Sequence, residues 1–371
     1  MNKTYCAFPF NGFQINARGM RLCCGSKKFL DTTPTEFWSG DYINSVRKDM
    51  KNNVNIVDCQ NCYDAEIKKS LSLRNHYNSK FKNIYTDTSP TTIDLDFSNL
   101  CNLKCIMCSS SRSSQWAKED NPSVKNNGVW AIDKNKIDNL CKISDKLEHI
   151  TIQGGEPSLI PEYSYYFEYL INNSIAKNID LDCISNLTNI NNKFFSQLQY
   201  FKKVNINVSL DAYGTHNNYI RYPSDFLQIE KNIYKLIDTN MQINLQISLQ
   251  TLSMFNFYEY LLWINDLENA FSNKNKRLGT NISKVFSPNI FNVYNAPLKL
   301  KEHFVNSLEK FYDKFSPNFD LKFNLEIQRT KNSLFDTTNT NSKELLEFIN
   351  KNDLKRNIKI TDYIPNFYDY F

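Results

Sequence analysis

Six short runs rich in β-branched and apolar residues, separated by stretches long enough for a helix, most constrain the fold of this 371-residue chain. The runs are residues 91–97, 148–154, 178–185, 203–211, 242–251 and 281–286. Strands that alternate with helices form βαβ units with right-handed crossovers and a parallel sheet. The pattern predicts an α/β fold with a partial (β/α)6 parallel barrel, and a doubly wound open sheet is the competing architecture.

Unusual residues follow the predicted strands. The first is followed by a loop with cysteines, residues 101–108. Gly154, Gly155 and Glu156 stand at the end of the second predicted strand, and Asn186 at the end of the third. The fourth ends with Ser209 and Asp211, and the fifth with Gln250 and Thr251. Because the carboxyl ends of parallel strands gather on one face, we expect these residues to converge on one site.

The loop CNLKCIMC places Cys101, Cys105 and Cys108 at spacings of three and two residues. Thiolates so close in sequence favour an iron–sulfur cluster or zinc. Three ligands leave one coordination position open, whereas a structural zinc site uses four. The alternatives are a zinc site completed by Cys141 or Cys183, and three inert buried cysteines.

Composition excludes several broad classes. A hydrophobic content of 41% and a charged content of 22% suit a soluble globular protein. The formal net charge of +5 is weak and dispersed, so it does not favour a nucleic-acid partner. No stretch of about 18 uninterrupted apolar residues predicts a membrane helix. Ten cysteines without a signal-peptide pattern predict a reducing compartment, and hence a cytoplasmic location.

The cysteine loop resembles the Cx3Cx2C signature of the radical S-adenosylmethionine (SAM) enzymes. The resemblance implies that Cys101, Cys105 and Cys108 hold a [4Fe–4S] cluster, whose fourth iron binds the amino and carboxylate groups of SAM. One electron from the cluster then cleaves SAM to methionine and a 5′-deoxyadenosyl radical, which abstracts a substrate hydrogen. It also implies a flavodoxin- or ferredoxin-type electron donor.

Three further motifs carry the same resemblance. QGGEP (153–157) resembles the family's GGE motif, ISNLT (184–188) its third-strand end, and VSLDAYGTHNNYIRYP (208–223) its fourth-strand stretch. The cofactor-binding residues that they imply are Met107, Gly154, Gly155, Glu156, Asn186, Ser209, Asp211, Arg221 and Gln250. Met107 stands where many members have an aromatic residue, and Leu187 where glycine is usual. A surface salt bridge is the alternative role for Arg221.

The first 62 residues contain a second cysteine group, Cys6, Cys23, Cys24, Cys59 and Cys62. The order of these motifs, a cysteine followed by a Gx4C segment and a CxxC pair, is similar to that in the SPASM and Twitch modules of radical SAM enzymes. The resemblance implies one auxiliary [4Fe–4S] cluster bound by Cys6, Cys24, Cys59 and Cys62. Cys23 is then a spare thiol or part of another ligand set. A four-cysteine zinc site and a redox-active CxxC dithiol are the alternatives.

We therefore predict an auxiliary-cluster module (1–88), a radical SAM partial barrel (89–296) and a helical extension (297–371). Helical patterns cover residues 35–50, as one helix, and 298–315 and 342–356. The predicted function is a radical SAM enzyme whose auxiliary cluster transfers electrons and whose substrate is a peptide or protein side chain. Alternative substrates are a nucleotide, a sugar or another small molecule. A non-catalytic iron–sulfur or zinc protein is the other class. The motifs assign no catalytic residue.

Overall fold

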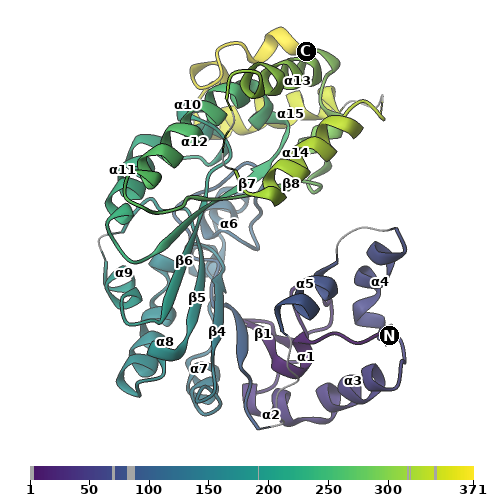
Figure 1. Cartoon of the computed structure of the whole chain (residues 1–371), viewed down its shortest axis with the longest axis vertical. Coiled ribbons are helices and arrows are strands. Elements are labelled where there is room, and N and C mark those ends of the chain that lie inside the picture. Colours follow the sequence, from purple (N-terminus) through teal and green to yellow (C-terminus); the bar gives the residue numbers. More distant parts are fainter. Residues whose placement is uncertain are drawn as a thin grey trace. The chain divides into compact units, whose positions relative to one another are not determined.

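The computed structural model describes residues 4–68, 72–81, 88–190, 192–315, 317, 319–337 and 341–371 (Figure 1). The α/β class is confirmed, because eight strands form one mostly parallel sheet in the order β2-β1-β3-β4-β5-β6-β7-β8. All six predicted strands are present. They are β3 (Thr92–Asp96), β4 (His149–Gln153), β5 (Asp180–Ser185), β6 (Lys203–Ser209), β7 (Gln242–Leu249) and β8 (Gly279–Lys284).

Two strands that the sequence analysis did not predict precede these six. β1 (Gly12–Asn16) pairs in parallel with β3, and β2 (Gly19–Arg21) pairs antiparallel with β1. Every residue of β1 is buried, so it lacks the alternation that reveals a half-exposed strand. The segment before residue 88 thus contributes strands to the sheet besides its cysteines.

The chain divides into two compact units. Unit 1 comprises Met1–Cys101, Asn121–Cys183 and Asn191–Val204, and unit 2 comprises Asn102–Asp120, Ile184–Ile190 and Asn205–Phe371. The two units are defined by the contacts between residues, and their limits differ from those of the three predicted segments. The boundaries of those segments remain a prediction. Among the residues that the structure describes, no helix is both long and apolar enough to cross a membrane.

Unit 1 covers its strands with short helices. They are α1 (Phe8–Asn11), α2 (Pro34–Ser39), α3 (Asp41–Lys51), α4 (Gln60–Ile67), α5 (Leu73–Lys80), α7 (Lys134–Cys141), α8 (Pro161–Asn172) and α9 (Lys193–Leu198). Helix α8 packs against both α7 and α9 (Figure 1). Its Tyr163 stacks on Phe97 and donates a hydrogen bond to the Leu95 carbonyl (3.0 Å), which joins the helix to β3.

The prediction of one helix over residues 35–50 was wrong. The segment forms α2 and α3, with Gly40 extended (ψ 170°) where the two meet. Glycine is among the poorest helix formers, and Thr33 and Glu36 form a capping box that starts α2 separately.

Unit 2 contains β7, β8 and most of β6, together with a second set of helices. They are α6 (Ser114–Asp120), α10 (Gly214–Ile220), α11 (Phe226–Ile237), α12 (Phe257–Ser272), α13 (Leu298–Tyr312), α14 (Leu321–Ser333) and α15 (Ser342–Arg356). The predicted helices over 298–315 and 342–356 correspond to α13 and α15, while α14 was not predicted. Helix α13 packs on α12, and α14 packs on β8 (Figure 1).

Candidate functional site

In unit 1, the two glycines of the QGGEP motif let the loop after β4 lie against the loop after β3. Gly154 has a φ of +132°, and a β-carbon there would lie 2.6 Å from the Ser98 carbonyl oxygen. A β-carbon on Gly155 would lie 2.1 Å from the Leu100 carbonyl oxygen. Only glycine fits such a close approach of two backbones. The contact holds the motif beside the residue that precedes Cys101.

Glu156 uses its side chain to shape the same loop. It is 1% exposed, and its Oε1 accepts hydrogen bonds from the backbone N–H (3.2 Å) and hydroxyl (2.8 Å) of Ser158. Its own N–H donates to the Leu100 carbonyl (2.8 Å). These contacts fix the start of the short helix η3 (Pro157–Leu159). The predicted contact with the SAM ammonium group stays a prediction.

In unit 2, Asp211 and Arg221 form a buried ion pair. Arg221 Nε lies 2.8 Å from Asp211 Oδ2, and Arg221 Nη2 donates to Oδ1 (3.0 Å). The backbone N–H of Ser248, on β7, also donates to Oδ1 (2.7 Å). Asp211 is 0% exposed and Arg221 8%, so the pair does not form on the surface. Burial raises the pKa of the Asp211 carboxyl, and the Arg221 guanidinium opposes that rise.

The same arginine reaches the cysteine loop. Its Nη1 lies 3.9 Å from Cys105 Sγ. The loop is anchored to the segment that carries Arg221, because Lys104 and Ile106 donate backbone hydrogen bonds to the carbonyls of Tyr222 and Ile220 (both 2.7 Å). Burial raises the pKa of Cys105 to about 12, and the Arg221 charge opposes this rise. A positive charge beside the sulfur favours the thiolate that a metal requires.

Met107 and Gln250 also meet in unit 2. Gln250 is 0% exposed, and its Nε2 lies 3.9 Å from Met107 Sδ. Its Oε1 is buried and has no hydrogen-bond partner within the described part of the chain. A buried acceptor without a partner costs free energy unless a water or ligand supplies a donor.

Asn186 belongs to a hydrogen-bonded group at the end of β5. Its Nδ2 donates to Asn102 Oδ1 (2.9 Å), and Asn102 Nδ2 donates to Thr188 Oγ1 (2.8 Å). Leu187 has a φ of +54°, which explains why glycine is usual there in the family that the motif resembles. Ser209 is half-buried at the end of β6. Unit 2 thus unites Cys105, Met107, Asp211, Arg221 and Gln250.

In unit 1, four N-terminal cysteines line one cavity. They are Cys6, Cys23, Cys59 and Cys62. Burial raises the pKa of Cys6 and of Cys59 to about 12 each. Burial also raises the pKa of Cys23, and nearby thiols, including those of Cys24, Cys6 and Cys59, add to the rise. Sequence reasoning chose Cys24 from its spacing, but Cys24 is exposed and is not among the cavity-lining residues.

Within the described residues, no group of three or more cysteine, histidine or carboxylate side chains has the arrangement of metal ligands. The donor set nevertheless suits iron and sulfide, because thiolates are soft ligands and none of the ten cysteines forms a disulfide in the structure. The unpartnered oxygen of Gln250 is compatible with a bound cofactor.

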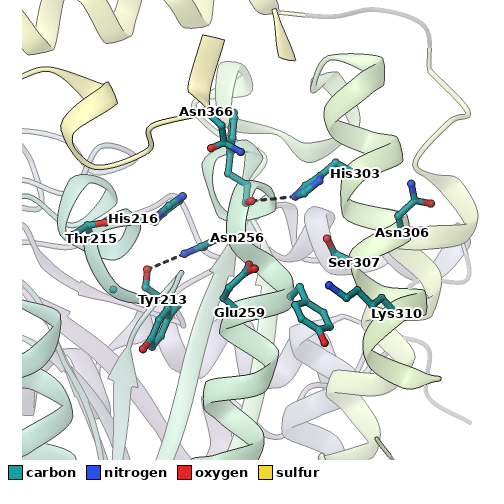
Figure 2. A pocket seen from close by; sticks show the side chains of 13 residues that line it. Tyr213, Thr215, His216, Asn256, Glu259, His303, Asn306, Ser307, Lys310 and Asn366 are labelled. Atoms are coloured by element: carbon teal, nitrogen blue, oxygen red, sulfur yellow. Dashed lines mark hydrogen bonds between the residues drawn. The ribbon is translucent and has the colours of Figure 1, made fainter. Parts of the chain in front are cut away.

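Unit 2 also has a polar cavity of about 710 Å³ that the sequence analysis missed (Figure 2). Its walls come from the start of α10, the start of α12, one face of α13 and the chain near Asn366. Asn256 Nδ2 donates to the Tyr213 carbonyl (2.9 Å), and His303 Nε2 donates to the Phe255 carbonyl (3.1 Å). No local pattern could reveal this cavity, since its residues are spread from 213 to 366.

Several polar groups of this cavity are available to a ligand. Asn256 is 7% exposed, yet its Oδ1 has no partner among the described residues. Glu259 and Lys310 line the cavity with opposite charges, and Lys310 Nζ lies 4.1 Å from the centre of the Tyr258 ring. Burial lowers the pKa of His216 to about 4, so this imidazole is neutral at pH 7.

Comparison with known proteins gives a match to one family model and matches to solved structures. Residues 95–252 match the sequence model of the Radical SAM superfamily, and no curated protein matches the chain. Native anSMEcpe with bound AdoMet is 20% identical over 61% of this chain and 62% of that chain, with a TM-score of 0.40. The chain therefore spans less than two thirds of that protein.

Two structures of Streptococcus suis SuiB are also similar to this chain. SuiB bound to S-adenosylmethionine is 13% identical over 83% of this chain and 70% of that chain, with a TM-score of 0.36. SuiB bound to precursor peptide SuiA is 15% identical with the same coverage and TM-score. The matched region, 95–252, contains CNLKCIMC, the Gly154–Glu156 loop and the Asp211–Arg221 pair. These motifs therefore all lie in the part of the chain that matches the Radical SAM superfamily.

Proposed function

We propose that this protein is a radical SAM enzyme with an auxiliary iron–sulfur cluster. The observation that carries the proposal is the Cx3Cx2C motif inside the matched domain, with Arg221 placed 3.9 Å from Cys105 Sγ. When bound, a [4Fe–4S] cluster supplies the electron that splits SAM into methionine and a 5′-deoxyadenosyl radical, which takes a hydrogen atom from the substrate. Cys101, Cys105 and Cys108 would hold this cluster.

The surrounding residues have separate tasks in this proposal. The Asp211–Arg221 pair keeps a positive charge beside the Cys105 sulfur and thereby favours its thiolate form. Gln250 would accept a hydrogen bond from the cofactor through its unpartnered Oε1, and Met107 would pack against the adenine. Gly154, Gly155, Glu156, Asn186 and Ser209 would line the remainder of the SAM site.

The auxiliary cluster would occupy the cavity lined by the N-terminal cysteines. Cys6, Cys59 and Cys62, with one of the neighbouring Cys23 and Cys24, would supply four thiolates. A cluster with four protein ligands has no open iron, so it would transfer electrons and would not bind substrate. The chain has ten cysteines, none in a disulfide, and we also propose a cytoplasmic location. We propose a flavodoxin- or ferredoxin-type electron donor, as the resemblance to radical SAM enzymes implies.

We propose a peptide or protein side chain as the substrate, bound in part by the polar cavity of unit 2. Two features of the cavity support this proposal. The unpartnered Asn256 oxygen could accept a hydrogen bond from a peptide N–H, and Glu259 and Lys310 offer opposite charges. A cavity of about 710 Å³ falls in the range of ligand sites, roughly 300–1,000 Å³. Nucleotide, sugar and other small-molecule substrates are the alternatives.

Formation of 5′-deoxyadenosine tests the reaction. Protein loaded with iron and sulfide without oxygen would be given SAM and a strong reductant, beside a variant with Cys101, Cys105 and Cys108 changed to Ala. Cys141→Ala is the matched control, because Cys141 lies on α7 outside both cysteine groups. We expect product from the wild type and the control alone. Fully loaded wild-type protein that yields none would favour the non-catalytic alternative.

Deuterium transfer tests the substrate class. Peptides, nucleosides and sugars prepared from fully deuterated cells would be supplied as three separate mixtures. We expect deuterium in 5′-deoxyadenosine with the peptides alone, and less transfer in a Glu259→Gln/Lys310→Gln variant that still forms unlabelled product. Transfer from nucleosides or sugars alone would overturn the peptide proposal.

A further inference from the structure

The cysteines that line the cavity of unit 1 come from three short segments of the chain. Cys6 precedes α1, Cys23 lies in the turn after β2, Cys59 ends the short helix η1 (Val57–Cys59), and Cys62 lies in α4. Pro9 and Leu22 add apolar surface, and Arg74 adds a positive charge. A cavity with thiol groups on several sides and a nearby cation suits an anionic iron–sulfur cluster.

Cys23 and its neighbour Cys24 have different surroundings. Cys23 lines the cavity, and the Ser26 N–H donates to its carbonyl (3.0 Å) to close the turn. A β-carbon on Gly25 would lie 3.7 Å from Cys23 Sγ and 3.0 Å from Leu73 Cδ1. A side chain at position 25 would therefore press on Leu73 and make only ordinary contact with the Cys23 sulfur.

Cys24 is exposed, does not line the cavity, and interacts with Asp94, Arg21 and Tyr77. Asp94 is buried on β3, and its Oδ2 accepts a hydrogen bond from the Tyr77 hydroxyl (3.4 Å). A ligating thiolate at Cys24 would lie near the Asp94 carboxyl group, whereas one at Cys23 would share its cavity with Arg74. Charge does not separate the two thiols, because Arg21 lies near Cys24. Position favours Cys23, because Cys23 lines the cavity with Cys6, Cys59 and Cys62 whereas Cys24 does not.

We propose that Cys23, and not Cys24, completes the ligand set of the auxiliary cluster with Cys6, Cys59 and Cys62. This inference rests on the auxiliary cluster of the proposed function and departs from the Gx4C spacing, which selects Cys24. It makes Cys24 a free thiol next to a cluster with no open iron. Cys24 is then the N-terminal cysteine that stays open to alkylation in the loaded protein.

The test isolates the auxiliary site. The parent protein carries Cys101→Ala, Cys105→Ala and Cys108→Ala, so that the iron bound after anaerobic loading belongs to the N-terminal cysteines. Cys23→Ala and Cys24→Ala are then added separately as a matched pair. The readouts are iron and sulfide per chain and the electron paramagnetic resonance signal of the reduced cluster. Far-ultraviolet circular dichroism checks that each variant folds.

We expect Cys23→Ala to lose most of its iron and the cluster signal, and Cys24→Ala to keep both at the parent's level. Loss in Cys24→Ala with retention in Cys23→Ala would overturn the assignment, and so would retention in both variants. A parent that binds no iron, or binds zinc in its place, would refute the auxiliary cluster itself. That outcome is distinguishable from failure of the ligand choice.

Alkylation gives a second readout that does not depend on substitution of a ligand. The loaded parent would be treated with iodoacetamide under native conditions and mapped by mass spectrometry. We expect modification of Cys24 and protection of Cys6, Cys23, Cys59 and Cys62. Protection of Cys24 together with modification of Cys23 would contradict the proposal.

Discussion

Replacing Arg221 with Met removes one half of the buried ion pair with Asp211. Both contacts of the guanidinium with Asp211, Nε to Oδ2 at 2.8 Å and Nη2 to Oδ1 at 3.0 Å, are lost. The Ser248 N–H remains, but it is a single donor for a carboxylate that is 0% exposed. Methionine fills much of the arginine volume, so the variant tests chiefly the charge.

The expected cost follows from the charge that is left behind. Breaking a buried pair by removing one partner costs about 3–5 kcal/mol of unfolding free energy. The folded variant can escape the unpaired charge by protonating Asp211, which at pH 7 costs about 4 kcal/mol for a carboxyl with an ordinary pKa near 3.9. Protonation therefore caps the electrostatic loss, and we expect a destabilisation of about 4 kcal/mol at pH 7.

The same reasoning fixes the pH dependence. In the variant the folded-state pKa of Asp211 is raised above its unfolded value, so stability is lost as the pH rises and recovered as it falls. At pH 5 protonation costs only about 1.5 kcal/mol, and the difference between wild type and variant should shrink to that value. Adding Asp211→Asn should recover most of the loss at pH 7, because no buried charge then remains.

Urea unfolding followed by circular dichroism at pH 7 and pH 5 measures these values. Arg277→Met is the matched control, because Arg277 pairs with Asp320 while its own side chain is 63% exposed. An exposed pair contributes at most about 1 kcal/mol. A loss in Arg221→Met no larger than in this control, or one that does not change with pH, would refute the reasoning.

Three other outcomes follow from single residues. Burial lowers the pKa of His216 to about 4, so the folded state resists protonation. We expect about 3 kcal/mol of stability to be lost between pH 7 and pH 4, and a smaller loss in His216→Gln, by urea unfolding. Burial raises the pKa of Asp94 to about 6, so its contribution is largest below pH 4 and is lost as the pH rises through 6. Asp94→Asn should flatten that decline by up to about 3 kcal/mol, and an unchanged pH profile would contradict this. Gly155→Ala places a β-carbon 2.1 Å from the Leu100 carbonyl oxygen, so we expect a loss of about 1–3 kcal/mol and less iron bound by the Cys101–Cys108 motif. Gly214→Ala is its control, because a β-carbon there meets no atom within 4 Å and the φ of +59° alone costs about 1–2 kcal/mol, with iron binding unchanged.

Local patterns in the sequence determined strands β3 to β8 and the family that the matched domain resembles. In β4 to β7 buried and more exposed residues alternate along the strand, so the period of two is visible without any neighbour. The Cx3Cx2C motif is equally local, since its three thiols lie within eight residues. These features depend only on backbone geometry and short spacing, which a sequence records directly.

Tertiary structure decided the features that depend on distant partners. β1 is a strand because it pairs with β3, some 80 residues later in the chain, and its buried residues show no alternation. Arg221 forms a buried pair with Asp211 because the turn through α10 brings the two together. Cys23 and Cys24 are adjacent and chemically identical, so only the turn after β2 determines which sulfur lines the cavity. Burial, charge pairing and the direction of a side chain are set by contacts across the fold, and sequence spacing alone does not contain them.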